Sequence, residues 1–351
     1  MSAPDQQTAP WRPLHIVAAG MCCAVGYRMA SAVSALRANM DHFQFSEFYD
    51  QQGQALKLAR LPFDDSWGTK RLATIAQLAL QDCLQQAPDF SPPRTALMLM
   101  AAERGRPHTE TERYTDIWHA CVEHITAQGL MPFHETSMIS PQGRAGIGPA
   151  LLQAQALLAG QTVSRVLLLG VDSYLNNVSI GHYLDQERLL TSDNSDGFIP
   201  GEGAAALLLE LAQPHSRGLL LTGAGVAREA ATIGGDTPNR AMGLSQAMRQ
   251  ALAAANICPA QLDFRMNDLN GEQFFAKEAA NACTRIMADE SKLLPMLHLA
   301  DCVGETGAAA APLSLAYLSQ IMAAPDGPGK AGLLHFGNDN GLRAACVVQY
   351  I

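Results

Sequence analysis

The sequence lacks a long apolar run, an apolar signal core and an excess of basic residues. No apolar run reaches the roughly 20 residues needed to span a bilayer, and the N-terminal segment 1–13 is polar and contains proline. The 24 Lys and Arg residues are outnumbered by 33 Asp and Glu, giving a formal net charge of −9. Such a balance disfavours binding to phosphate backbones. We therefore expect a cytoplasmic protein with no membrane span and no nucleic-acid partner.

The eight cysteines also lack the short, regular spacing of a metal site. Cys22 and Cys23 are adjacent and lie in an apolar stretch, which favours buried free thiols. With 48% hydrophobic and 16% charged residues, the composition is that of an ordinary folded protein. We predict neither a metal nor a cofactor.

Strand-like and helix-like patterns alternate along the chain. An apolar run from His15 to Gly20 is followed by a helical pattern that reaches Met40, and further strands and helices follow in the same rhythm. This alternation predicts α/β architecture with a largely parallel sheet covered by helices on both faces. Because the elements recur in two comparable sets, we predict a flexible segment 1–13, an N-terminal half 14–215 and a C-terminal half 216–351.

One segment carries a family signature. The sequence DGFIPGEGAAALLLE, which begins at Asp196, resembles the matching segment of β-ketoacyl-ACP synthases of the thiolase superfamily. Four further stretches match in the same order: HIVAAGMCCAVG, ALLQAQALLAG with LLLGVDS, VGETGAAAA, and FGNDNG. The resemblance implies a thiolase-like fold, in which two similar βα halves give a five-layered αβαβα architecture, usually as a dimer.

A catalytically active member of this family needs a cysteine nucleophile at a helix N-terminus. The family places it seventeen residues before the glycine that ends the buried helix, and counting back from Gly160 gives Gly143. Its neighbours Ser140 and Gln142 are not thiols either. The resemblance therefore implies that the nucleophile is absent. Gln142 lies one residue from the position where chain-length-factor subunits often carry glutamine.

The two family histidines are also replaced. The first opens a motif after a strand like LDFRMN, and Asp268 stands in its place. The second precedes the Gly/Ala-rich helix, where this chain has Glu305, with Asp301 at the position of the usual lysine. Ionised carboxylates repel the oxyanion that imidazole donors would stabilise, so conventional decarboxylative condensation should fail.

The family's pocket scaffold is retained where its reacting groups are not. The resemblance assigns this scaffold to five residues: Phe198, Glu202, Phe336, Gly337 and Asn340.

The acidic replacements have two interpretations. Asp268, Glu272, Asp301 and Glu305 either form a cluster for acid–base chemistry or a divalent cation, or are solvated groups in a pocket that has opened to water. We favour the second, because no matching base or nucleophile accompanies them. Ser140 as a substitute nucleophile lacks a histidine on any recognised site segment.

Our leading hypothesis is a catalytically degenerate ketosynthase-like protein. It would act as the non-catalytic partner of an active ketosynthase, as chain-length-factor subunits do, or as an accessory or adaptor protein in another pathway. We expect a homodimer, or a heterodimer with a ketosynthase; an acyl carrier protein or another protein is a further candidate partner. The alternative is an active acyl-thioester enzyme with carboxylate-based chemistry, which would make it an acyltransferase of the 3-oxoacyl-ACP synthase type.

Overall fold

The structure is a computed structural model that describes residues 10–63, 66–107, 109–287 and 292–351. Most of the segment 1–13, predicted to be flexible, therefore lies outside the described residues. Among the described residues, no helix combines the length and the apolar character needed to cross a bilayer.

A ten-stranded sheet runs through the molecule in the order β10-β9-β11-β12-β8-β1-β7-β6-β4-β5, and β2 and β3 form a separate hairpin. The strands are β1 (Leu14–Cys23), β2 (Phe43–Tyr49), β3 (Ala55–Ala59), β4 (Thr95–Ala101), β5 (Met138–Pro141), β6 (Arg165–Ser173), β7 (Glu202–Leu211), β8 (Leu219–Arg228), β9 (Phe264–Asn267), β10 (Met296–His298), β11 (Ala331–Gly337) and β12 (Leu342–Tyr350). The α-helices are α1 (Met29–Arg37), α2 (Gly68–Leu84), α3 (Thr111–Ala127), α4 (Ile147–Ala159), α5 (Asn177–Asp185), α6 (Met242–Ala255), α7 (Gln273–Ile286), α8 (Ala300–Val303) and α9 (Ala310–Ile321).

The sheet consists of two halves with the same topology. Taken in chain order, the strands of the first half (β1, β4, β5, β6, β7) and of the second (β8, β9, β10, β11, β12) occupy equivalent places in the sheet order. Only the three outer strands of each half, β6, β4 and β5 in the first and β11, β9 and β10 in the second, are parallel. β7 and β12 run antiparallel to both of their neighbours. The sheet is thus mixed rather than largely parallel. The two halves join through two residue pairs, Leu14 with Leu221 and His15 with Leu220.

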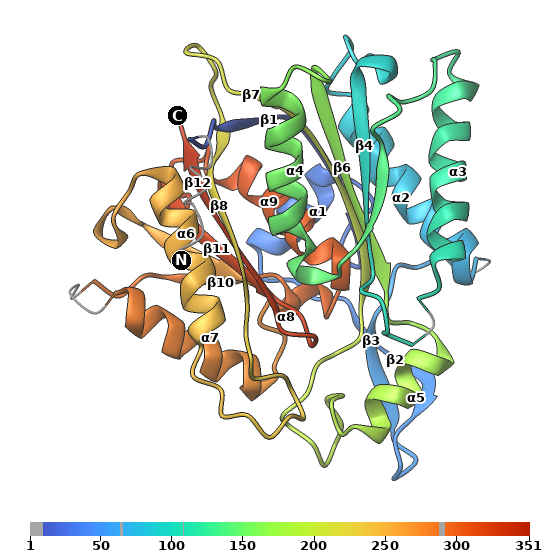
Figure 1. The fold of residues 1–351 in the computed structure, drawn as a ribbon. Coiled ribbons are helices and arrows are strands. Elements are labelled where there is room, and N and C mark those ends of the chain that lie inside the picture. Colours follow the sequence, from blue (N-terminus) through green and yellow to red (C-terminus); the bar gives the residue numbers. More distant parts are fainter. Residues whose placement is uncertain (1–9, 64–65, 108, 288–291) are drawn as a thin grey trace, which may run out of the picture.

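Helices and sheets stack in five layers (Figure 1). Helices α1, α4 and α9 lie between the two halves of the sheet, with α2 and α3 outside the first half and α6 and α7 outside the second. Alternate side chains of a strand therefore enter different cores. Leu168 of β6 packs in the middle layer, while Leu167 and Leu169 pack against the outer helices. Burial on both faces explains why these strands read as continuous apolar runs.

Glycines let an outer helix lie directly on the first strand of each half. A Cβ at Gly20 of β1 would lie 2.2 Å from the carbonyl oxygen of Ala79 in α2, and one at Gly225 of β8 would lie 2.1 Å from that of Ala247 in α6. Neither glycine has a positive φ, so the requirement is close approach rather than backbone conformation. The same device in both halves is consistent with the predicted duplication.

The β2–β3 hairpin and α5 form a small cluster beyond one end of the first half of the sheet (Figure 1). Its core contains Leu56 and Leu58 of β3, together with Tyr174, Tyr183 and Phe198. The three aromatic rings contact one another with centroids 5.1 to 5.5 Å apart. This cluster covers the segment that leads from β6 to β7, next to the site described below.

A buried ion pair fixes the start of β7 to α2. Arg71 donates through Nε to Glu202 Oε2 at 2.8 Å and pairs through Nη2 with Oε1, and the backbone N–H of Leu61 donates to Oε1 at 2.9 Å. Both charged side chains are buried. The family-like glutamate thus serves as an internal anchor.

Because Glu202 neutralises a buried guanidinium, Glu202→Ala should lower the free energy of unfolding by about 3–5 kcal/mol, measured by urea denaturation. Asp326→Ala is the matched control, since it removes the acid of the exposed Arg37–Asp326 pair and should not change stability measurably. Equal effects of the two substitutions would contradict the anchoring role.

Candidate functional site

The site lies where the parallel strands of the two halves end. Of the predicted residues, Gly143 follows β5 and Asp268 follows β9; Asp339, which was not predicted, lies in the turn after β11. Glu305 lies between α8 and α9, with its backbone N–H bonded to the carbonyl of Ile199 at 2.8 Å. The carboxyl ends of parallel strands are the usual place for a site in such sheets.

Arg144 is the centre of this site. Its Nη1 donates to Glu305 Oε2 at 2.8 Å, its Nη2 to Asp339 Oδ1 at 3.3 Å, and its Nε lies 3.7 Å from Asp268 Oδ2. The guanidinium also stacks over the ring of Phe275 at 4.7 Å. One buried cation is therefore shared by three carboxylates.

A second arginine extends the network. Arg188 donates through Nε to Glu272 Oε1 at 2.6 Å and through Nη1 to Asp339 Oδ2 at 2.7 Å. The amide of Asn270 links the two arginine clusters, because its Nδ2 donates to Glu272 at 3.2 Å and to Glu305 at 2.6 Å. Three of the four predicted acids, Asp268, Glu272 and Glu305, thus belong to one network of ion pairs and hydrogen bonds.

The solvated-pocket interpretation is wrong for these three acids. Glu272 and Glu305 are buried, and the side chain of Asp268 is 8% exposed. Their arginine partners offset the free-energy cost of removing these carboxylates from water. Asp301 does not join them: it lies in the first turn of α8, its side chain is 77% exposed, and it pairs with His298 at 2.8 Å. The described residues contain no His, Cys, Asp or Glu group arranged to hold a metal ion.

Gly143 has neither the conformation nor the space for a side chain. Its φ of 60° and ψ of −150° are values that residues other than glycine rarely adopt. A Cβ there would lie 2.3 Å from Glu103 Oε2. The carboxyl of Glu103, from the loop after β4, therefore occupies the space into which a nucleophile at position 143 would project.

Ser140 and Gln142 offer no replacement nucleophile in this geometry. The hydroxyl of Ser140 makes no hydrogen bond to a carboxylate or imidazole within the described part of the chain. Gln142 contributes its backbone carbonyl, which accepts a hydrogen bond from Asn338 Nδ2 at 2.5 Å. The oxygen of the same Asn338 amide accepts the N–H of Ala145 at 2.8 Å, so this loop is tied to the loop after β11.

Burial perturbs two of the acids. Burial raises the pKa of Asp268 to about 6, with the nearby Glu305 adding to the rise, while Arg144 and the N–H of Gly337 at 2.9 Å oppose it. Burial likewise raises the pKa of Glu103, and Arg106 opposes this. In both carboxyls burial favours the protonated form, which raises the pKa.

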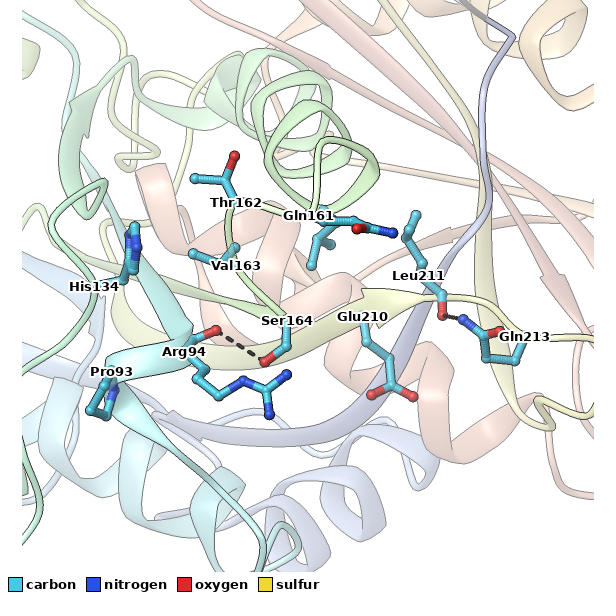
Figure 2. Close-up of a pocket in the computed structure, with 11 residues that line it drawn as sticks. Pro93, Arg94, His134, Gln161, Thr162, Val163, Ser164, Glu210, Leu211 and Gln213 are labelled. Carbon is cyan, nitrogen blue, oxygen red and sulfur yellow. Dashed lines mark hydrogen bonds between the residues drawn. The ribbon is translucent and has the colours of Figure 1, made fainter.

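Little free space remains beside the acids. The cavity lined by Asp268, Glu305 and Thr306 has a volume of about 20 Å³, room for about one water molecule. A larger depression of about 640 Å³ lies at the opposite ends of β4 and β6, where Arg94, His134 and Glu210 line it (Figure 2). None of the predicted site residues lines that depression.

The predicted pocket scaffold divides into core residues and residues near the acids. Phe198, Phe336 and Glu202 are fully buried. The N–H of Gly337 donates to Asp268. Asn340 is exposed in the turn between β11 and β12, where its Oδ1 accepts the N–H of Leu342 at 3.0 Å.

The arginines of the site were not predicted from the sequence. Arg106, Arg144 and Arg188 carry no family signature in this chain, yet they hold the acids. A signal was present, because each carboxylate placed in a buried loop requires a cation nearby. Arg144 directly follows the position predicted for the nucleophile.

No family model and no curated protein matches the chain. Solved structures do match it. One of them is described as a type II polyketide synthase acyl carrier protein in complex with its ketosynthase bound to the hexaketide. The alignment with a chain of this complex covers 98% of the present chain and 100% of that chain, at a TM-score of 0.76 and 16% identity. The fold is the thiolase-like fold of ketosynthases.

Two further structures share this ketosynthase fold. The oxazolomycin ketosynthase domain of Streptomyces albus JA3453 aligns with 97% of the chain over 75% of its own length, at a TM-score of 0.77 and 14% identity. A chain from the Xenorhabdus doucetiae complex of a ketosynthase with its chain length factor aligns over the full length of both chains, at a TM-score of 0.70 and 15% identity. The predicted fold class is confirmed.

The raised pKa of Asp268 makes stability depend on pH in a defined direction. Its pKa is about 6 in the folded protein, against 3.8 for an ordinary aspartate. The folded state therefore binds this proton more tightly, and the resulting stabilisation is lost as the pH rises through about 6. Asp268→Asn keeps an acceptor for Gly337 and should gain about 2 kcal/mol relative to the parent protein between pH 4.5 and 7.5 in urea denaturation. A stability difference independent of pH would contradict the shifted pKa.

Gly143→Cys should be destabilising through both backbone strain and the clash with Glu103, by about 3–5 kcal/mol in total. Adding Glu103→Ala removes the clash but not the strain, so the double variant should recover part of the loss. Urea denaturation measures both, with Glu103→Ala alone as the control. If Glu103→Ala recovered none of the loss, the carboxyl would not be what fills this space.

Proposed function

We propose that this chain is a catalytically degenerate ketosynthase-like protein that acts as the non-catalytic partner subunit of an active ketosynthase. The observation that carries the proposal is the filled site: glycine stands at the position matched to the nucleophile, Glu103 occupies the adjacent space, and Arg144 holds the acids at the positions matched to the two histidines. Acyl-thioester chemistry needs an attacking group and donors for an oxyanion, and this arrangement offers neither.

The neighbouring structures support a role in assembly. One contains a ketosynthase with its chain length factor, and another is described as the ishigamide ketosynthase/chain length factor. A protein with this fold can associate with another subunit through its outer surface even though its site is closed by arginine–carboxylate pairs. An accessory or adaptor role in another pathway fits the same closed site with a different protein partner.

The edge of the first half of the sheet is the surface we assign to partner binding. β5 is the last strand of the sheet, and Met138 on it is 42% exposed. An unpaired strand edge presents backbone groups that another chain can continue as sheet. We infer that a second subunit, either a ketosynthase or a copy of this chain, adds to β5.

The raised pKa of Asp268 is the one observation that favours the alternative, an active enzyme with carboxylate chemistry, because a pKa near 6 suits a general acid or base. Two features count against it. The adjoining cavity holds about 20 Å³, and Asp268 lies close to an arginine with no nucleophile beside it.

Purification of the tagged chain from its native cells, followed by native mass spectrometry, tests the assembly role. A heterodimer with a ketosynthase is expected, and Met138→Asp should abolish it. Met296→Asp is the matched control, since Met296 is 40% exposed on β10 at the other edge of the sheet. Recovery of a monomer alone, or equal losses from both substitutions, would contradict the proposed surface.

Incubation with acyl-carrier-protein and coenzyme A thioesters tests the absence of catalysis. We expect neither covalent labelling nor turnover, with an active ketosynthase as the positive control. Turnover that Asp268→Asn abolishes would establish the alternative instead.

A further inference from the structure

Another cavity, of about 280 Å³, lies among the loops beside the site. The loop after β4 contributes Glu103, Arg104 and Arg106, the end of α5 and the turn after it contribute His182 and Arg188, and Asp339 and Asn340 line it from the turn after β11. It is much larger than the cavity of about 20 Å³ beside Asp268 and Glu305. None of the residues matched to the family's reacting groups lines it.

Among the described residues, three arginines and two acids line this cavity. Arg188 and Asp339 neutralise each other, since Arg188 Nη1 donates to Asp339 Oδ2 at 2.7 Å. Arg104 is exposed and forms no ion pair with any described residue. Glu103 is the remaining acid of the lining, and burial raises its pKa while Arg106 opposes the rise. Since Arg106 pairs with Asp172, Arg104 is the cation of the lining that has no ion-pair partner among the described residues.

Arg106 has hydrogen-bonding capacity that the protein does not use. The residue is 6% exposed, and its Nη2 pairs with Asp172. Its Nε and Nη1 have no hydrogen-bond partner among the described residues, and neither has Oε2 of Glu103. Nη1 lies 3.8 Å from Glu103 Oε2, which is too long for a hydrogen bond. Buried donors without partners are costly and mark places where a ligand supplies what is missing.

We propose that this cavity binds a small oxyanion, a carboxylate or phosphate group held between Arg106 at its base and Arg104 at its rim. The entering oxyanion displaces the Glu103 carboxyl, whose Oε2 has no hydrogen-bond partner among the described residues, and accepts the hydrogen bonds that Arg106 leaves open. Arginine suits this task because its guanidinium is always charged and presents several donors to such oxygens. The inference concerns a ligand and stands independently of the proposed subunit role.

Titration calorimetry and thermal denaturation of the full chain test the proposal with two probes, sodium acetate and inorganic phosphate. Sodium chloride keeps the ionic strength constant throughout. We expect at least one probe to give saturable heats and a saturable rise in Tm that chloride does not reproduce. Acetate alone would identify a carboxylate site, and phosphate alone a phosphate site. Absence of saturation with both probes would overturn the proposal.

Three variants separate this site from general electrostatic attraction. Arg104→Gln should weaken binding about tenfold, since it removes a charged hydrogen-bond donor. Glu103→Ala should strengthen binding, because the oxyanion no longer competes with the carboxyl, and a gain of affinity is not a consequence of misfolding. Arg94→Gln is the matched control, an exposed arginine that lines the depression at the opposite end of the sheet (Figure 2). Equal weakening by Arg94→Gln and Arg104→Gln, or weakening by Glu103→Ala, would contradict the site.

Discussion

The site depends on one electrostatic constraint, that a carboxylate removed from water must meet a cation. Arg144 is the cation for three carboxylates, those of Asp268, Glu305 and Asp339. It can serve all three because Gly143 turns the chain so that the arginine faces the ends of β9 and β11. Each carboxylate comes from a different segment, so the guanidinium joins the loop after β5 to the loop after β9, the turn after β11 and the segment before α9. Removing the arginine would take the buried cation from Asp268 and Glu305, whereas Asp339 would keep its pair with Arg188. An uncompensated buried charge is far more costly than the pair is favourable. The network therefore specifies how the two halves meet as much as it fills the site.

The large-scale fold could be predicted from the sequence because its strands are buried on both faces. Such strands appear as continuous apolar runs, and the run from Arg165 to Ser173 coincides with β6. The β2–β3 hairpin, α3 and α5 were not predicted. The exposed faces of α3 and of the hairpin dilute the apolar pattern: β2 exposes Phe45 to solvent, for example, and its local alternation is interrupted by a register shift after Phe45. Short strands such as β5, with four residues, carry too few side chains to be recognised without their neighbours.

The site was predictable in position but not in chemistry. Motif order placed Asp268, Glu272 and Glu305 near one another, and the structure brings them together. Their partners could not be found in the same way, because Arg144 and Arg188 are 44 residues apart in the chain and nothing local indicates that both point to Asp339. The interpretation of the acids as solvated groups followed from that missing information. Asp301 lies outside the cluster for a different reason. In a short helix such as α8, a shift of one residue along the sequence decides whether a side chain points inward or to solvent.

The middle layer of helices has a consequence for the integrity of the chain. One continuous core contains side chains from β6 and β7 of the first half and from β11 and β12 of the second, packed on α4 and α9. Neither half closes its own interior, so the two are not autonomous folding units even though their topologies repeat. Proteolytic cleavage of the loop between β7 and β8 would break the backbone without separating the pieces. The fragments would stay bound as a complemented pair, and expressed apart each would expose the apolar surface that the other covers.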